Sequence, residues 1–195
     1  MGLIIALVIV AVIVFWAVGM YNNLVNSRNR VRNGFSQIDV QLTRRYDLIP
    51  NLVETVKGYM SYEKSTLEAV ITARNAAQAG LKKAAADPSD PEAIKQLAAA
   101  ESTLGGTLGR LFALTEAYPE LKANQNMQQL QEELTSTENK VAFARQAFND
   151  SVLGYNNACQ SFPGSLIANN FGFKPAEYLE IEQPEKRAVP KVSFS

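Results

Sequence analysis

An uninterrupted apolar run near the N-terminus constrains this chain more than any other feature. Leu3 to Tyr21 is 19 residues long and contains no charged or amide side chain. Because an α-helix rises about 1.5 Å per residue, such a helix spans nearly the whole hydrocarbon core of a bilayer, which is ~30 Å thick. A helix in the core of a soluble protein is disfavoured, because so long a run leaves no polar face. The run therefore predicts a transmembrane anchor at residues 1–27, with the span at about residues 3–21.

The charges that follow the run predict its orientation. No charged side chain precedes residue 28, and the first three are Arg28, Arg30 and Arg32. Under the positive-inside rule this pattern places a very short N-terminus outside and everything after Tyr21 in the cytoplasm. Trp16 and Tyr21 lie near the end of the span, where amphipathic rings favour the headgroup region. We therefore expect a single-pass protein of the cell (inner) membrane, with these residues at the membrane interface and the lipid bilayer as a partner.

A cleaved signal peptide is the alternative interpretation of the same run. Ala17-Val18-Gly19 is a small-x-small triplet of the kind that a signal peptidase accepts. Met1-Gly2 supplies no basic n-region, however, and the apolar run is longer than the usual h-region of ~7–15 residues. These two departures favour an uncleaved anchor.

The composition excludes several classes of enzyme and metal site. The chain has no His, one Cys, and 19 basic side chains against 19 acidic ones. The lack of His rules out Ser-His-Asp and Cys-His catalysis, and a single Cys rules out disulfide, zinc-cluster and iron–sulfur frameworks. A net charge of zero gives no global attraction to nucleic acid. We therefore predict a non-enzymatic protein with no catalytic residue, cofactor or metal, and we expect Cys159 to be a small buried hydrophobe.

Apolar residues recur at steps of three, four and seven after Leu24, which predicts long amphipathic helices. The first of these continues directly from the membrane span, and Pro50 lies inside it. Proline removes one backbone hydrogen bond and clashes with the carbonyl of Tyr46, so we expect a kink there or a fresh helix start capped by Asp47. The predicted apolar stripe of this helix comprises Val31, Phe35, Ile38, Leu42, Ile49, Leu52, Val56 and Tyr59.

Local capping signals mark the next two helices. Ser65-Thr66-Leu67-Glu68 is a capping-box sequence that predicts a helix start, although the continuity of helix across residues 58–65 is left open. Asp90 followed by Pro91 predicts the N-cap and first residue of a third helix. Tyr118-Pro119 is expected to end that helix, because the residue before a proline is disfavoured in the α conformation.

The last long helix is predicted to begin near Asn124 and to stop at Pro163-Gly164, with Phe162 as the final member of its inner stripe. Long helices joined by short loops are typical of an antiparallel bundle. The expected fold is all-α, with an N-terminal transmembrane helix followed by a long antiparallel four-helix bundle at residues 28–173. A C-terminal tail at residues 174–195 completes the chain.

A line of polar residues runs beside the apolar stripe of the last helix, at steps of seven, four and seven. Polar side chains at such spacing lie at the edge of a core, and when buried they must find partners. We hypothesise an interhelical polar network that sets the packing register, with a solvated flank as the alternative. The members on the last helix are Glu138, Arg145, Asn149 and Asn156, and the candidate partners on the first helix are Arg45, Asp47 and Asn51.

Two glycines in the third helix predict a close helix contact. Gly105 and Gly109 are four residues apart, so they share one face of the helix and allow another backbone to approach. The contact is expected inside the bundle, or between two copies of the chain.

Charge is distributed unevenly along the cytoplasmic part. Residues 28–45 carry five Arg and one Asp, whereas residues 177–185 carry four Glu and no basic residue. Basic residues beside a span attract anionic headgroups by about 1 kcal/mol each. The basic stretch is equally explained as a topology determinant alone.

The chain resembles the LemA family of bacterial membrane proteins over nearly its full length. After the span, the residues that carry this resemblance are Arg44–Val53, Ala117–Ala123, Glu138-Asn139-Lys140, Arg145, Asn149, Tyr155-Asn156, Phe162-Pro163-Gly164 and Phe171-Gly172-Phe173. The resemblance implies an N-terminal membrane helix with a tiny outside segment, followed by a mostly helical cytoplasmic bundle. It implies no catalytic residue. The family signature is expected to include Arg45, Asp47, Pro50, Asn51, Glu138, Arg145, Asn149 and Asn156.

The preferred functional hypothesis is a non-enzymatic, membrane-anchored helical scaffold. It would form a homo-oligomer at the cytoplasmic face of the membrane and organise or reshape that membrane. The alternative is an adaptor or sensor that binds another membrane protein through its bundle. An enzyme would need an acid/base site, such as a deep polar pocket around Glu138 and Arg145.

Overall fold

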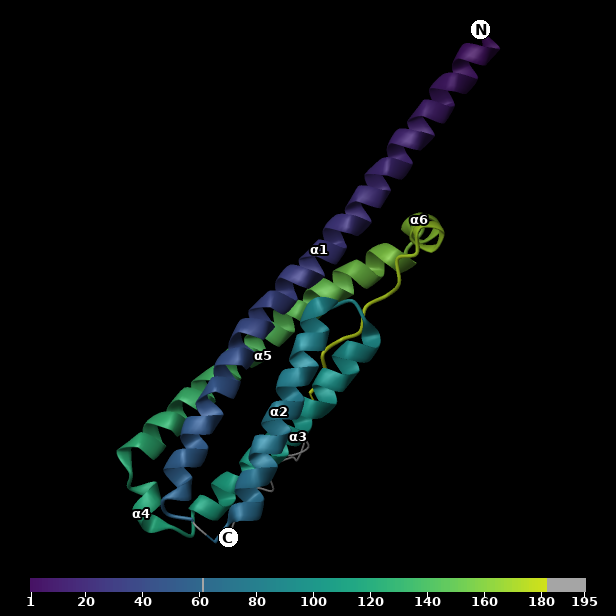
Figure 1. The fold of residues 1–195 in the computed structure, drawn as a ribbon. Helices are drawn as coiled ribbons and strands as arrows, with labels where there is room; N and C mark the ends of the chain where they lie inside the picture. Colours follow the sequence, from purple (N-terminus) through teal and green to yellow (C-terminus); the bar gives the residue numbers. More distant parts are fainter. Residues whose placement is uncertain (61, 182–195) are drawn as a thin grey trace, which may run out of the picture.

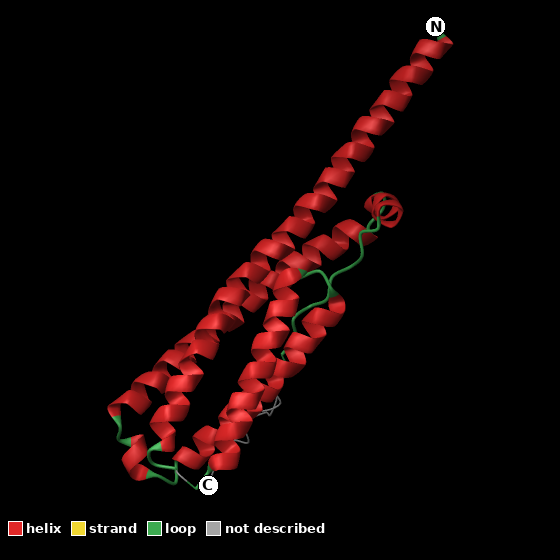
Figure 2. Ribbon diagram, in the orientation of Figure 1, coloured by secondary structure: helices red, strands yellow, loops and turns green. Residues whose placement is uncertain are grey.

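The computed structural model describes residues 1–60 and 62–181, and within this part of the chain there are helices, turns and extended segments but no strand (Figure 2). The all-α prediction is confirmed for these residues. The helices are α1 (Gly2–Lys57), α2 (Lys64–Ala86), α3 (Pro91–Thr115), α4 (Pro119–Lys122), α5 (Gln125–Gln160) and α6 (Gly164–Phe171).

The second half of α1 forms an antiparallel bundle with α2, α3 and α5 (Figure 1). Helix α1 packs along α5, and α2 packs along α3 and against α1. The first half of α1 extends away from the bundle alone, and Leu24 is its first buried residue. This projecting part is long and apolar enough to cross a membrane, and none of it is buried inside the fold.

The predicted stripe of α1 forms the centre of the core. All its members from Val31 to Val56 are buried, and Phe35 meets Phe148 of α5 edge to face, with ring centroids 5.6 Å apart. Gly34 allows this close approach, because a Cβ atom there would lie 3.2 Å from the Cα atom of Phe148. Tyr59 is the exception to the prediction, since α1 has already ended at Lys57 and the Tyr59 side chain is 40% exposed.

Helix α1 continues through Pro50 without a break or a fresh start. The carbonyl that the missing proline N–H would normally bond belongs to Tyr46, four residues earlier. The Nε atom of Arg74 in α2 donates to that carbonyl at 3.2 Å. The neighbouring helix therefore satisfies the acceptor that proline leaves free, and a break at this point is not required.

The capping-box prediction for α2 is wrong. Helix α2 begins at Lys64, and Glu63 is the N-cap without a side-chain hydrogen bond. The backbone amides of Thr66 and Leu67 already bond to the carbonyl of Glu63, so Ser65 lies inside the first turn and cannot cap it. The chain turns between α1 and α2, where the side chain of Met60 is buried.

The starts of α3 and α5 agree with the predicted caps. The carboxylate of Asp90 accepts from the amide of Glu92 at 3.0 Å, and Pro91 is the first helical residue. The side chain of Asn124 accepts from the amide of Met127 at 3.1 Å. Helix α3 ends earlier than predicted, at Thr115, and the short helix α4 occupies the connection to α5.

The end of α5 differs from the prediction. Helix α5 stops at Gln160, and Phe162 is 80% exposed rather than part of the core. A further helix, α6, follows within residues 164–171, where no helix was predicted. Gly164 is required at its start, because a Cβ atom there would lie 2.3 Å from the carbonyl oxygen of Ala158. Gly172 ends α6 in the left-handed conformation, with φ of 72°.

After α6, residues 173–181 form no helix or strand, and Figure 1 shows them running back along the bundle. Ala176 and Leu179 are buried in this segment, which therefore contributes to the core.

Candidate functional site

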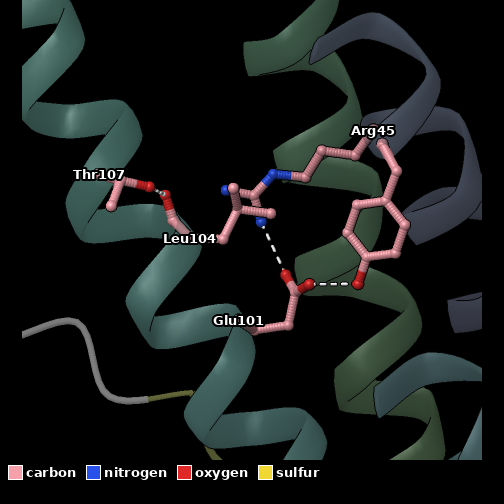
Figure 3. Close-up of polar contacts among 5 residues, drawn as sticks. Arg45, Glu101, Leu104 and Thr107 are labelled. Atoms are coloured by element: carbon pink, nitrogen blue, oxygen red, sulfur yellow. Dashed lines mark hydrogen bonds and ion pairs between the residues drawn. The ribbon is translucent and has the colours of Figure 1, made fainter. Parts of the chain in front are cut away.

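A buried polar cluster joins α1 to α3. The Nη1 atom of Arg45 donates to one carboxylate oxygen of Glu101 at 2.9 Å, and the hydroxyl of Tyr46 donates to the other oxygen (Figure 3). The side chain of Glu101 is fully buried, whereas that of Arg45 retains 12% of its exposure. Both oxygens of the buried carboxylate are therefore bonded, as a buried charge requires.

Burial in the cluster shifts the pKa of two side chains, Glu101 and Tyr46. Burial raises the pKa of Glu101, and the opposing effects of the Arg45 charge and the Tyr46 hydrogen bond do not outweigh it. Burial and the neighbouring Glu101 carboxylate raise the pKa of the Tyr46 hydroxyl as well. Tyr46 consequently keeps its proton and acts as a donor.

Tyr46 also extends the cluster to α2. Its hydroxyl bonds Glu101 of α3, while its backbone carbonyl accepts from Arg74 of α2. We call Arg45, Tyr46, Arg74 and Glu101 the three-helix cluster. It holds α1, α2 and α3 together at one level of the bundle.

An open groove lies beside this cluster, between α3 and α5. Its volume is about 760 Å³, and Arg45 lies at its α1 side. The α3 wall contains Glu101, Ser102, Gly105, Gly106, Leu108, Gly109 and Phe112. The α5 wall contains Gln131, Leu134, Thr135, Glu138, Asn139, Val141, Ala142 and Arg145, and Ile181 of the C-terminal segment also lines the groove. We call this feature the α3–α5 groove.

The two predicted packing glycines face this groove rather than a neighbouring helix. A Cβ atom at Gly105 or Gly109 would meet no other atom within 4 Å among the described residues. The prediction of close packing inside the bundle is therefore wrong for both. Glycines that do allow close contacts between bundle helices include Gly34, against α5, and Gly80, against α3. A contact of Gly105 and Gly109 with a second copy of the chain stays a prediction.

The predicted polar network divides into separate parts. Arg45, Glu138 and Arg145 all line the α3–α5 groove, whereas Asp47 and Asn51 are exposed on α1 and are not among its lining residues. The partner of Arg45 is Glu101, which was not among the predicted members of the polar network.

Asn149 and Asn156 bind the C-terminal segment instead of α1. The side chain of Asn156 accepts from the amide of Ala176 at 2.8 Å and donates to its carbonyl at 2.9 Å. Asn149 makes the same pair of bonds to Leu179, at 2.9 Å and 3.4 Å. Each amide side chain thus pairs with both backbone groups of one residue. We call Asn149 and Asn156 the asparagine clamp.

One feature of the sequence indicated that Glu101, which was not predicted as a network member, is buried. Glu101 follows Leu97 by four residues and precedes Leu104 by three, and both leucines are fully buried. A charged residue in this register of an apolar stripe must be buried with a partner. No comparable signal identifies Arg74, because its partner is a backbone carbonyl on another helix.

The predicted interface residues lie where α1 leaves the bundle. Trp16 is on the projecting part, and Arg30 and Arg32 are exposed. The ring of Tyr21 packs edge to face on two phenylalanines of the α6 region, and Arg28 lies over one of these rings.

Comparison with known proteins relates the chain to one family. The LemA family model matches residues 34–194. The magnetosome protein MamQ of Magnetospirillum gryphiswaldense is 28% identical over 182 residues, which cover 84% of this chain and 65% of that protein. The magnetosome protein MamQ 2 of Paramagnetospirillum magneticum is 26% identical over 182 residues, with the same coverage of each chain. Protein LemA of Metamycoplasma hominis is 22% identical over 177 residues, which cover 91% of this chain and 76% of that protein.

The chain spans about 65% of the length of the MamQ proteins that it matches. The family match covers most of the chain, including the three-helix cluster residues and the asparagine clamp. With its projecting apolar helix, the molecule is a membrane-associated helical protein. Because the family match includes the whole bundle from Gly34 onward, this protein belongs to the LemA family.

Proposed function

We propose that the protein is a non-enzymatic, membrane-anchored scaffold that self-associates at the cytoplasmic face of the membrane through the α3–α5 groove. The observation that carries this proposal is the exposed backbone of Gly105 and Gly109 along the groove wall. Two glycines in a helix interior cost about 1 kcal/mol each relative to alanine. A contact that needs this bare helix face offsets that cost.

The chemistry of the groove suits a helix of a second copy. Small residues let helix backbones approach closely, which increases van der Waals contact. Phe112, which is half-buried, supplies apolar surface on the same wall, and Glu138 and Arg145 supply charges of both signs on the facing wall. Burial of the apolar surface would drive association, while the charges would select its register.

The anchor favours contacts between copies. Helix α1 passes from the apolar span into the bundle without interruption, so the bundle keeps one orientation relative to the membrane. Copies in one membrane therefore present their grooves in the same sense and at the same height. Confinement to a surface also raises their effective concentration. We propose from this arrangement that assemblies organise or reshape the membrane.

The assembly state of the full chain in mild detergent tests the proposal. Light scattering after size exclusion should show an oligomer for the wild type. Gly109→Gln should shift the mass toward one copy, because the side chain fills the groove. Gly154→Gln is the matched control. Gly154 is an exposed glycine of α5, a Cβ atom there would also meet no other atom within 4 Å, and the residue does not line the groove. A wild-type protein that is monomeric at micromolar concentration would overturn the proposal.

The open groove also supports an adaptor that binds a helix of another membrane protein. Co-purification from membranes separates the two functions. A foreign protein recovered in stoichiometric amount with the wild type, but lost with Gly109→Gln, would favour the adaptor.

A further inference from the structure

Three large apolar side chains in or next to α6 are exposed at the α5–α6 end of the molecule. Phe162 is 80% exposed, Leu166 is 54% exposed, and Phe171 is 63% exposed. We call these three residues the α6 apolar patch. Helix α6 itself carries no charged residue. Exposed apolar patches of this size are unfavourable in water and mark interaction sites. The position of this patch in the molecule indicates what covers it.

The patch lies beside the end of the membrane span. The ring of Tyr21 meets that of Phe171 edge to face, with centroids 5.0 Å apart, and that of Phe173 at 5.6 Å. The Cβ position of Gly164 is 3.5 Å from the Cε atom of Met20. Helix α6 therefore sits at the level where α1 leaves the bundle (Figure 1).

Basic residues lie directly below this level. The guanidinium carbon of Arg28 is 5.1 Å from the ring centroid of Phe173, and Arg30 and Arg32 are exposed on the next turn of α1. Apolar side chains at one level and arginines at the next match the order of acyl chains and phosphates at a membrane surface.

We propose that α6 is an interfacial membrane helix, which lies in the headgroup region beside the anchor and inserts Phe162, Leu166 and Phe171 into the bilayer. The ligand is lipid of the same membrane that α1 spans, so the inference rests on the anchoring in the proposed function. Lipid is favoured over a second copy of the chain because the patch is continuous with the span through Tyr21 and Met20.

The fold holds α6 at this level from both ends. Gly164 lets its first turn pack on the last turn of α5, and Gly172 turns the chain back toward the bundle. The asparagine clamp then fastens the segment that follows. With two membrane contacts at fixed positions, the protein would resist rotation and tilt about its single span.

Depth-dependent quenching in lipid nanodiscs tests the proposal with the full chain. The single Cys159 is replaced by Ala, and an environment-sensitive fluorophore is attached at Leu166→Cys. Ile71→Cys is the matched control, because Ile71 is also an exposed apolar residue but lies on the α2 face of the bundle. A parallel sample keeps Cys159, which is buried and reacts slowly, in case its replacement impairs folding.

Lipids with a spin label near the headgroup should quench the fluorophore at position 166 several-fold more strongly than the one at position 71. Equal, weak quenching at both positions would overturn the interfacial helix. The intrinsic fluorescence of Trp16, the single Trp of the chain, reports the anchor separately in unlabelled protein. Quenching of Trp16 without quenching at position 166 rejects only the interfacial helix, whereas loss of both rejects the membrane anchor as well.

Discussion

At the scale of single residues, Tyr46 has two roles that depend on different groups. Its hydroxyl donates to the buried carboxylate of Glu101, and its carbonyl, left without an intrahelical donor by Pro50, accepts from Arg74. One residue of α1 thus bonds α3 through its side chain and α2 through its backbone. The proline creates the free acceptor that makes the second bond possible.

Replacing Arg74 by Leu should destabilise the bundle by about 1–3 kcal/mol, because a partly buried carbonyl loses its donor. The same substitution in a Pro50→Ala background should cost less, because the alanine N–H bonds the Tyr46 carbonyl within α1. Denaturant unfolding of the four proteins in detergent measures this coupling. Equal costs in both backgrounds would show that the Arg74 bond does not compensate for the proline.

The raised pKa of Glu101 predicts a pH dependence. The folded state binds the Glu101 proton more tightly than the unfolded state does. This group therefore stabilises the fold most at low pH, and its contribution falls as pH rises through the folded-state pKa. The unfolding free energy of wild type minus that of Glu101→Gln, measured at a series of pH values, should decrease as pH rises. An increase would mean that the Arg45 ion pair outweighs burial and lowers the pKa.

Arg45 and Arg145 both line the groove, but their replacement should differ in effect. Arg45→Met leaves the buried Glu101 carboxylate without its charge partner, which should cost about 3 kcal/mol near neutral pH. Arg145→Met should cost less, because among the described residues no ion pair joins Arg145 to a fully buried acid. Thermal unfolding of the two variants compares them. An equal loss of stability would restore the wider network that the residue spacing suggested.

At the scale of elements, the asparagine clamp attaches an extended segment to a helix. Such a segment has no neighbouring strand, so its buried backbone groups need side-chain partners. Asn156 supplies both a donor and an acceptor to Ala176, and Asn149 does so for Leu179. The amide side chain is suited to this role because it carries one acceptor oxygen and one donor nitrogen.

Asn156→Ala should release the clamped segment. The buried backbone groups of Ala176 lose both partners, which costs about 1–3 kcal/mol locally. Hydrogen exchange measured by mass spectrometry should accelerate for residues 173–181, while peptides of α2 stay unchanged. Asn157→Ala is the control, because Asn157 is exposed on the adjacent position. Unchanged exchange in the Asn156 variant would contradict the role of the clamp.

At the scale of the whole molecule, one helix belongs to two environments. Helix α1 is apolar and has no buried residue before Leu24, and its last part contributes to the core of the bundle. Because a continuous helix is stiff, the position of the span determines the position of the bundle. The α6 apolar patch lies at the transition between the two.

The basic residues after the span predict that the bundle faces the cytoplasm. A C-terminal fusion to green fluorescent protein should fluoresce in bacterial cells, and the same fusion to alkaline phosphatase should be inactive, because that enzyme folds outside the cytoplasm. The reverse pattern would show that the bundle is exported.

Local spacing determined much of the fold. The apolar run indicated the anchor, the recurrence of apolar residues indicated the stripes of α1, α3 and α5, and Asp90 and Asn124 indicated helix starts. These features depend on groups no more than a few residues apart, so the linear order of residues contains them. Helix α6 was not predicted, because its two defining glycines depend on the tertiary structure. Gly164 is needed for a close contact with α5, and Gly172 adopts a left-handed conformation.

The polar contacts were decided only by the tertiary structure. Arg45 finds Glu101 56 residues away, and Asn156 finds Ala176 20 residues away, on elements that the fold brings together. Spacing along one helix showed which polar residues share a face, but it contained no information on what faces them. The sequence by itself therefore determined the apolar N-terminal helix, the other long helices and their apolar faces. Packing decided the partners of the buried polar groups and left Gly105 and Gly109 facing an open groove, because both depend on the register between helices.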